Sequence, residues 1–244
     1  MATALPTRAQ SGVVRPAEKG SIAMNYVALD VEDIDTDCCA FDGGEPSSPM
    51  SEAHGKAPVP AHVQDAIRTL LRWAGDNPDR EGLLDTPARV GRAWREYCAG
   101  YAEDPGVHLS RTFSEVAGYD EVVLLKNIPF QSHCEHHLAP IIGMASIAYL
   151  PRNRVVGISK LARVLQGYAR RLQIQERLTS EVAQCIWDNL QPHGVAVVIE
   201  AQHGCMTGRG VLTPGVGMIT SRMLGCFLDN ASSRKEVLSL MGRG

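Results

Sequence analysis

Two short motifs, far apart in the sequence, pair cysteine with histidine. The first is Cys134-Glu-His-His137, and the second, His203-Gly-Cys205, follows about seventy residues later. In the first motif a thiol and an imidazole stand three residues apart, which lets both point inward from one turn and bind one ion. Two thiolates with an imidazole favour zinc among the common ions. The two motifs therefore predict a zinc site where the fold brings them together.

The number of ligands separates two kinds of zinc site. Two cysteines with two histidines make a closed structural site, whereas three ligands leave the fourth position open for water, as catalysis requires. His136, His137 and His203 provide one more imidazole than a closed site needs beside the two cysteines. We therefore expect a catalytic site whose remaining histidines work as acid and base. Glu135 is interpreted as a residue that orients the ligands, because adjacent side chains on a turn diverge.

A second group of residues is suited to phosphate. The sequence has no G-x-x-x-x-G-K-[ST] loop, so a nucleoside triphosphate cannot be bound in the P-loop manner. In GISKLAR, Ser159 can cap a helix, Lys160 follows it, and Arg163 lies about one turn further along the same face. This pattern predicts an anion site, although an ordinary amphipathic helix with solvated basic residues has the same pattern. Arg209, between two glycines, follows Cys205 closely enough to serve an anion near the metal.

Gln175 and Glu176 stand at the start of another predicted helix. A carboxylate there can accept two parallel hydrogen bonds from a guanine-like pair of N–H groups. The alternative is that Glu176 only complements the helix dipole. The segment is therefore a candidate for recognition of a purine base.

The elements that must position these residues follow from apolar spacing and from capping residues. Thr86 is the expected N-cap of the second helix, and Ser159 that of the third. Helices segregated from an antiparallel sheet predict the α+β class. The expected helices cover residues 61–75, 86–100, 159–168, 175–190 and 234–241, and the expected strands cover 121–128, 143–151, 195–205 and 218–227.

Composition excludes several classes of protein. The chain has 244 residues, 44% of them hydrophobic, which is enough for a substantial core. A net charge of -3 gives no general field that would attract nucleic acid or an anionic membrane. No apolar run approaches the roughly 20 residues of a membrane span, and the seven cysteines do not form the dense even framework of a small secreted domain. We expect a cytoplasmic protein without nucleic-acid or membrane partners.

The chain divides into two parts by composition. Residues 1–59 mix Gly, Pro, Ser and acidic residues without sustained periodicity, which predicts a mobile, disordered tail. Residues 60–244 form the predicted catalytic domain, with N-terminal helices over 60–110 and the core over 120–244.

From about Pro60 onward the chain resembles the GTP cyclohydrolase I family. The segments CEHH, GISKLARVLQGYARRLQIQERLT and EAQHGCMTGRGV match the family's most specific signatures in order and separation. The resemblance implies a tunnelling fold, in which each subunit contributes a four-stranded antiparallel sheet and helices to a toroidal homo-oligomer, typically a decamer with interfacial active sites. It also implies that GTP and water are converted to 7,8-dihydroneopterin triphosphate and formate, the first step towards folate or tetrahydrobiopterin.

The resemblance further implies roles for the residues of the two motifs. Water activated by Zn²⁺ attacks C8 of guanine, His203 gives a proton to N7, and His136 acts as a second acid or base beside the water. Ser159 contacts the ribose during the later Amadori-type rearrangement. The implied zinc ligands are Cys134, His137 and Cys205.

By the same resemblance, Glu176 with Gln175 reads the guanine edge. Adenine would present an acceptor at N1 and leave a buried carboxylate unsatisfied, which explains the selection of GTP over ATP. Bacterial members of the family commonly have lysine where this chain has Arg92, which keeps the cation but changes its geometry. The implied triphosphate ligands are Lys160, Arg163 and Arg209, with Arg89 and Arg92 joining from a neighbouring subunit.

Three other functions compete with this interpretation. A zinc deaminase acting on a nucleobase would also use activated water and a glutamate, but its H-x-E and P-C-x-x-C signature is absent. A reductase of related fold that acts on a deazaguanine needs a thioimide-forming cysteine and no zinc, so metal content separates it. A nucleotide sensor with structural zinc would bind GTP without changing its ultraviolet spectrum.

Overall fold

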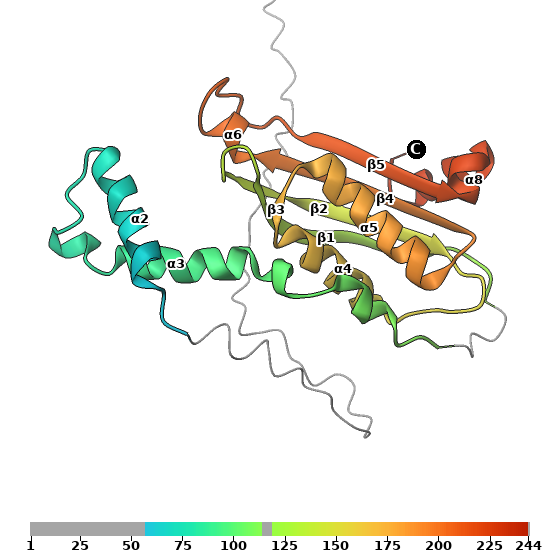
Figure 1. Cartoon of the computed structure of the whole chain (residues 1–244). Coiled ribbons are helices and arrows are strands. Elements are labelled where there is room, and N and C mark those ends of the chain that lie inside the picture. The colour runs from blue at the N-terminus through green and yellow to red at the C-terminus, as the bar shows by residue number, and fades with distance from the viewer. Residues whose placement is uncertain (1–56, 114–118, 244) are drawn as a thin grey trace, which may run out of the picture. The chain divides into compact units, whose positions relative to one another are not determined.

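The computed structural model describes residues 57–113 and 119–243 (Figure 1). The predicted tail, residues 1–59, falls almost entirely outside this part. Within it, every helix is too short or too polar to cross a membrane.

The core of the fold is one mixed sheet with the strand order β3-β1-β2-β4-β5. Its four long strands pair antiparallel, as expected, whereas the two-residue β3 pairs parallel with the end of β1. The predicted count of four strands was therefore wrong, because a strand of two residues is too short to show an alternating pattern. The strands are β1 (Val123–Cys134), β2 (Pro140–Leu150), β3 (Leu172–Gln173), β4 (Gly194–His203) and β5 (Met218–Gly225).

The first strand is longer than predicted. It continues through Pro129 to Cys134 instead of ending at Ile128. The register between β1 and β2 shifts between Leu125 and Ile128, where Asn127 takes a left-handed backbone with φ of 55°. This irregularity lets the strand continue past the proline and carry Cys134 to its end.

All five predicted helices are present, but two predicted caps were wrong. Thr86 is the first residue of α3 and Asp85 its N-cap, while Ser159 is the second residue of α4 behind the N-cap Gly157. Both helices begin one or two residues early, and neither receives a side-chain cap hydrogen bond. The α-helices are α2 (Ala61–Trp73), α3 (Thr86–Tyr97), α4 (Ile158–Ala169), α5 (Gln175–Leu190), α6 (Gly204–Thr207), α7 (Cys226–Asp229) and α8 (Ala231–Leu240), with 3-10 turns η2 (Glu81–Leu83), η3 (Ala99–Ala102) and η4 (Pro105–Leu109).

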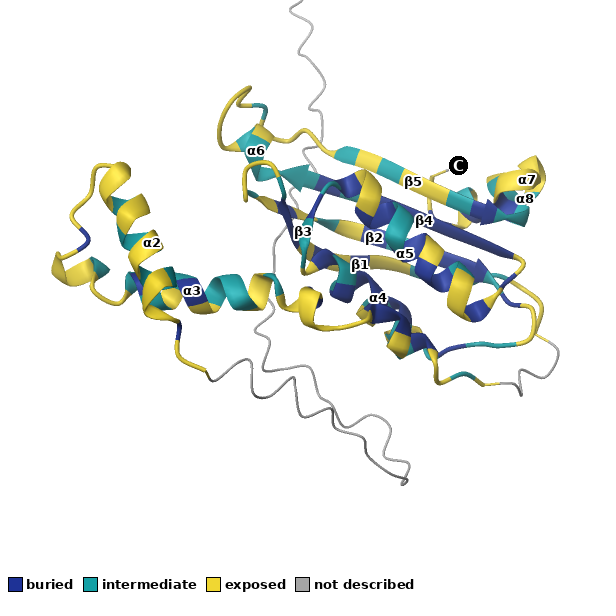
Figure 2. Ribbon diagram, viewed as in Figure 1, coloured by how far each residue is buried: buried dark blue, intermediate teal, exposed yellow. Residues whose placement is uncertain are grey.

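The main core lies between the sheet and the pair α4 and α5, which cover one face (Figure 2). Apolar residues at helical spacing on α5, such as Leu178, Val182 and Ile186, are fully buried there. A smaller cluster on the opposite face packs Phe227 and Val237 from α7 and α8 against β2 and β4. The helices over both faces leave the end of the sheet that carries Cys134 and His203 free to hold functional residues.

The N-terminal helices are much less covered than the sheet. No residue of α2 is buried, and Trp73 is 83% exposed. The segment after α3 contacts the end of α4 at Gly100, whose N–H donates to Arg170 O at 3.0 Å. A Cβ at Gly100 would lie 2.0 Å from the backbone oxygen of Gly167, so only glycine allows this approach.

Candidate metal centre and active site

The first motif forms a tight turn over residues 134–139, which we call the metal turn. Cys134 is the last residue of β1, and its N–H donates to Ala139 O at 2.8 Å. Leu138 donates back to Cys134 O at 2.8 Å and takes a left-handed backbone with φ of 55°. The turn buries Cys134 and leaves His137 exposed, so the motif presents one ligand from inside the protein and one from its surface.

The second motif departs from the predicted geometry. We expected the strand to run to Cys205, but β4 ends at His203 and Cys205 lies in the one-turn helix α6. Strand β2 lies between β1 and β4, and Ile141 at its beginning pairs with His203. This register brings α6 next to the metal turn.

The two motifs converge as predicted. One ligand atom from each of Cys134, His137 and Cys205, which we call the ligand triad, lies within 4.8 Å of the others. Zinc bonds of about 2.0–2.3 Å bring two ligands to less than about 4.6 Å apart, so a small side-chain adjustment closes the site around an ion. Within the described residues this is the one such group of three or more His, Cys, Asp or Glu side chains. Its three members match an open, catalytic type of site better than a closed Cys₂His₂ site.

The groups around the triad act on the pKa of Cys205 in opposite directions. Burial raises the pKa of the Cys205 thiol, and the neighbouring Cys134 raises it further, because a second thiolate beside the first is unfavourable. Arg209 opposes this effect and lowers the pKa of Cys205. The exposed Arg209 therefore lies close enough to the triad to act on a charge there.

His203 is oriented by a hydrogen bond from α5. Its Nε2 lies 2.8 Å from Gln175 Oε1, and the amide nitrogen of Gln175 lies within 3.1 Å of Ile199 O and Met218 O. Carbonyl oxygens only accept, so the amide nitrogen must face the strands and Oε1 must face the imidazole. His203 therefore carries its proton on Nε2, and Nδ1 is the nitrogen left for proton exchange.

Burial lowers the pKa of His203, and the charge of Glu176 partly offsets this effect. The offset places Glu176 near His203, as expected for two residues of one site. Glu176 is exposed in the first turn of α5, whereas Gln175 is only 1% exposed and has partners at both ends of its side chain. Gln175 therefore holds His203, and Glu176 is the member of the pair that can meet a ligand.

His136 lies in the metal turn beside the triad. It is exposed, its Nδ1 lies 3.9 Å from Cys134 Sγ, and its Nε2 lies 3.8 Å from Glu135 Oε1. The ring centroids of His136 and His137 are 6.3 Å apart. The metal turn thus contributes the imidazole of His137 to the triad, and the imidazole of His136 lies beside the triad.

The remaining predicted residues lie on separate helices. Ser159, Lys160 and Arg163 occupy the start of α4, whose N–H groups have no side-chain cap. Arg89 and Arg92 are exposed on α3, and Arg89 pairs with Asp85 at 3.2 Å. Among the described residues, none of these five makes a hydrogen bond or ion pair with the ligand triad.

Two neighbours of the metal turn were not predicted from the sequence. His133 is buried and its ring lies 4.4 Å from that of Tyr97 and 5.3 Å from that of Trp94, so α3 packs directly beside the first ligand. Burial lowers the pKa of His133. Arg177 on α5 forms an ion pair with Glu135. His133 directly precedes the first motif and Arg177 directly follows Glu176, but neither residue belongs to a motif with a spacing that indicates a function.

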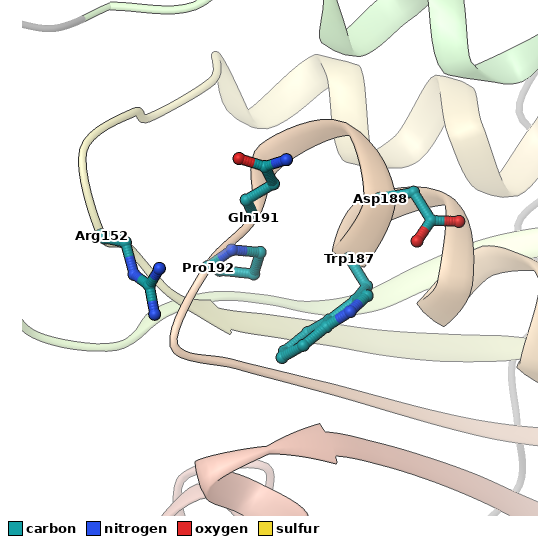
Figure 3. A pocket seen from close by; sticks show the side chains of 5 residues that line it. All are labelled: Arg152, Trp187, Asp188, Gln191 and Pro192. Carbon is teal, nitrogen blue, oxygen red and sulfur yellow. The ribbon is translucent and has the colours of Figure 1, made fainter.

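A shallow pocket of about 250 Å³ lies at the other end of α5 (Figure 3). None of the predicted site residues lines it. The lining residues are Arg152, Trp187, Asp188, Gln191 and Pro192.

Comparison with known proteins identifies the family to which the chain is similar. The family model described as GTP cyclohydrolase I matches residues 63–242. GTP cyclohydrolase 1 of Hyphomonas neptunium is 50% identical over 188 residues, covering 77% of this chain and 91% of the relative. GTP cyclohydrolase 1 of Brucella abortus is 49% identical over 204 residues, covering 82% of this chain and 96% of the relative. A solved archaeosine synthase QueF-Like chain is 20% identical, with a TM-score of 0.36 and coverage of 43% of this chain and 93% of that one.

Proposed function

The chain belongs to the GTP cyclohydrolase I family, and we propose that it opens the guanine ring of GTP at the ligand triad. The products are 7,8-dihydroneopterin triphosphate and formate. The observation that carries the proposal is the convergence of Cys134, His137 and Cys205 within 4.8 Å from two distant motifs. GTP is a nucleotide of the cytoplasm, so a cytoplasmic location is part of the proposal.

Zinc is the proposed metal. Two thiolates and one imidazole suit it, and three protein ligands leave one position for water. When bound, zinc supplies a water molecule whose pKa is lowered to about 7. The exposed His137 and the buried Cys134 would hold the ion together with Cys205.

His203 and His136 are the proposed acid and base groups. Addition of water at C8 of guanine and protonation of N7 open the imidazole ring, and a second hydrolysis releases formate. His203 exchanges its proton through Nδ1, because Nε2 is bonded to Gln175. The exposed His136, next to the triad, is the proposed acceptor of the proton of the attacking water.

Glu176 is the proposed reader of the base. Its carboxylate accepts hydrogen bonds from N1–H and the exocyclic amine of guanine, a donor pair that adenine lacks. Its effect on the pKa of His203 supports this position beside the reacting ring. Gln175 contributes to recognition only through His203, since both ends of its side chain already have partners.

The triphosphate is assigned to the cations around the site. Lys160 and Arg163 lie in the first two turns of α4, behind its uncapped N-terminus, where backbone N–H groups add to the attraction for anions. Ser159, in the same turn, is the proposed contact to the ribose. Arg209 joins them from the loop after α6, and its effect on Cys205 supports a place near the metal.

We also propose a toroidal homo-oligomer with the tunnelling fold and ten subunits. In the described chain, the outer edge of β5 has no partner strand, and the two-residue β3 covers only the end of β1. Pairing of β5 of one subunit with β1 of the next satisfies both edges and closes a ring. Such a ring also allows Arg89 and Arg92 of one subunit to reach the site of another.

The experiment that tests the function uses purified, zinc-loaded protein with GTP and, separately, ATP. We expect formate and dihydropterin absorbance from GTP alone. GTP left intact by a zinc-replete oligomer would favour the sensor with structural zinc. Sedimentation that shows a fully active monomer would contradict the interfacial site.

A further inference from the structure

The metal turn is attached to α5 through Glu135, the residue between Cys134 and His136. The Glu135 N–H donates to Gln173 O at 3.0 Å, and its carboxylate forms an ion pair with the guanidinium of Arg177. The side chains of Glu135 and Arg177 are 32% and 41% exposed. One attachment through the backbone and one through the side chain limit both the position and the rotation of the turn.

Arg177 is itself held in one orientation. Its Nε donates to Gln173 Oε1 at 3.0 Å, and one terminal nitrogen donates to Leu172 O at 3.0 Å. Gln173 is only 1% exposed, and its amide donates to Tyr168 O at 3.1 Å and to Glu181 Oε2 at 2.8 Å. The guanidinium that meets Glu135 is therefore anchored, through a buried amide, to α4 and α5.

We propose that Arg177 is a positioning residue for the metal centre, acting through Glu135. By holding that carboxylate, Arg177 keeps the metal turn in the shape in which Cys134 and His137 face Cys205. The turn therefore loses less conformational entropy when the ion binds. The inference rests on the proposed metal centre and deepens it. Arg177 is no ligand in this proposal, and it touches the turn through Glu135. Loss of a group that orients metal ligands in this way typically weakens metal binding by about 10- to 100-fold.

The test measures the Kd of the full chain for Zn²⁺ by competition with a chromophoric chelator. We expect Arg177→Met and Glu135→Gln each to weaken binding by roughly 10- to 100-fold. The double variant should be little worse than either single one, because the two residues act as a pair. Arg177→Lys keeps the charge but loses the planar fork that bonds Glu135 and Gln173 together, so it should fall between Arg177→Met and the unmodified chain.

The chain offers a closely matched control in the ion pair between Arg243 and Glu200. Its side chains are 32% and 43% exposed. Its partners are 43 residues apart in sequence, against 42 for Arg177 and Glu135. It joins β4 to the C-terminal segment instead of the metal turn. Arg243→Met should leave the Kd for Zn²⁺ within about twofold of the unmodified value, as for surface changes away from special features.

Cobalt substitution gives a readout that general loosening of the fold does not imitate. With Co²⁺ bound, the d–d and thiolate charge-transfer bands report the geometry of Cys134, His137 and Cys205. We expect Arg177→Met to shift these bands and Arg243→Met to leave them unchanged. Circular dichroism of the metal-free variants checks folding, and if Arg177→Met does not fold, Arg177→Lys and Glu135→Gln decide the question.

Two results overturn the inference. One is an Arg177→Met protein with the Zn²⁺ affinity and Co²⁺ spectrum of the unmodified chain. The other is an equal loss of affinity in Arg243→Met, since the effect would then follow from losing any ion pair of this kind. An unmodified chain that binds no Zn²⁺ would overturn the metal centre itself, which separates failure of the proposed function from failure of the positioning role.

Discussion

The two ends of α5 differ in what their polar side chains do. At the N-terminal end, Gln175 and Arg177 are bonded on several sides and hold groups from other elements, His203 and Glu135. At the C-terminal end, five residues line a pocket that gathers none of the predicted ligands, acids or bases. The hollow and the convergence of separately held chemical groups therefore lie at opposite ends of one helix, and we assign the reaction to the end where the groups converge.

The largest effect should come from the ligand triad. Cys205→Ser removes a thiolate ligand, so we expect loss of bound Zn²⁺ and a fall in kcat of at least about a thousandfold, the order of a few kcal/mol of transition-state stabilisation. Mass spectrometry of the native protein and formate release measure the two effects. A variant that keeps both zinc and turnover would remove Cys205 from the site.

Glu176→Gln should have the next largest effect. The substitution replaces a charged acceptor that faces two donors, which costs about 1.5–3 kcal/mol, so KM for GTP should rise by roughly 10- to 100-fold. Zinc content should not change, because Glu176 is outside the triad. Discrimination between GTP and ATP should fall as well, and an unchanged KM would return Glu176 to the role of complementing the helix dipole.

The same substitution, glutamine to asparagine, can be made at both ends of α5. Gln175→Asn is too short to reach His203 and the strand carbonyls together, so kcat should fall by about tenfold or more, with zinc retained. Gln191→Asn in the pocket should change nothing measurable, because Gln191 has a left-handed backbone with φ of 48° that asparagine also accepts. Equal losses at both positions would mean that α5 is merely being destabilised.

Lowering the pH should first destabilise the end of the sheet that carries the ligand triad. Burial lowers the pKa of both His133 and His203, so the unfolded chain binds more protons than the folded one below the ordinary histidine value of 6.5. Stability is therefore complete above about pH 6.5 and is lost as the pH falls from there through the lowered values. The Tm of the metal-free protein should drop by a few degrees between pH 7.5 and 5.5, and His133→Phe should reduce that drop. Hydrogen exchange that rises first around the pocket would contradict this.

The smallest effect should come from the pocket. Arg152→Met removes its cation, and we expect kcat, KM and zinc content to stay within about twofold, as for surface changes away from special features. A tenfold loss of turnover would show that this end of α5 takes part in the reaction after all.

Spacing and periodicity determined the parts of this protein that depend on near neighbours in sequence. The predicted helices and long strands are confirmed, because apolar repeats and terminating glycines act over one or two turns. Their ends differ by up to three residues, except that β1 runs six residues further than predicted. The pairing of cysteine with histidine in two motifs, with a surplus imidazole, was likewise visible in short segments, whereas the set of three ligands followed from the family resemblance. Their resemblance to a known family agrees with the family match.

How those segments are held together depends on strand register and helix packing. The register that places Ile141 beside His203 brings α6 to the metal turn, although the predicted strand through Cys205 was wrong. The hydrogen bond between Gln175 and His203 joins residues 28 positions apart. The ion pair between Arg177 and Glu135 joins residues 42 positions apart. Such bonds leave no local pattern, because their geometry is set by strand order and helix packing and not by the residues on either side.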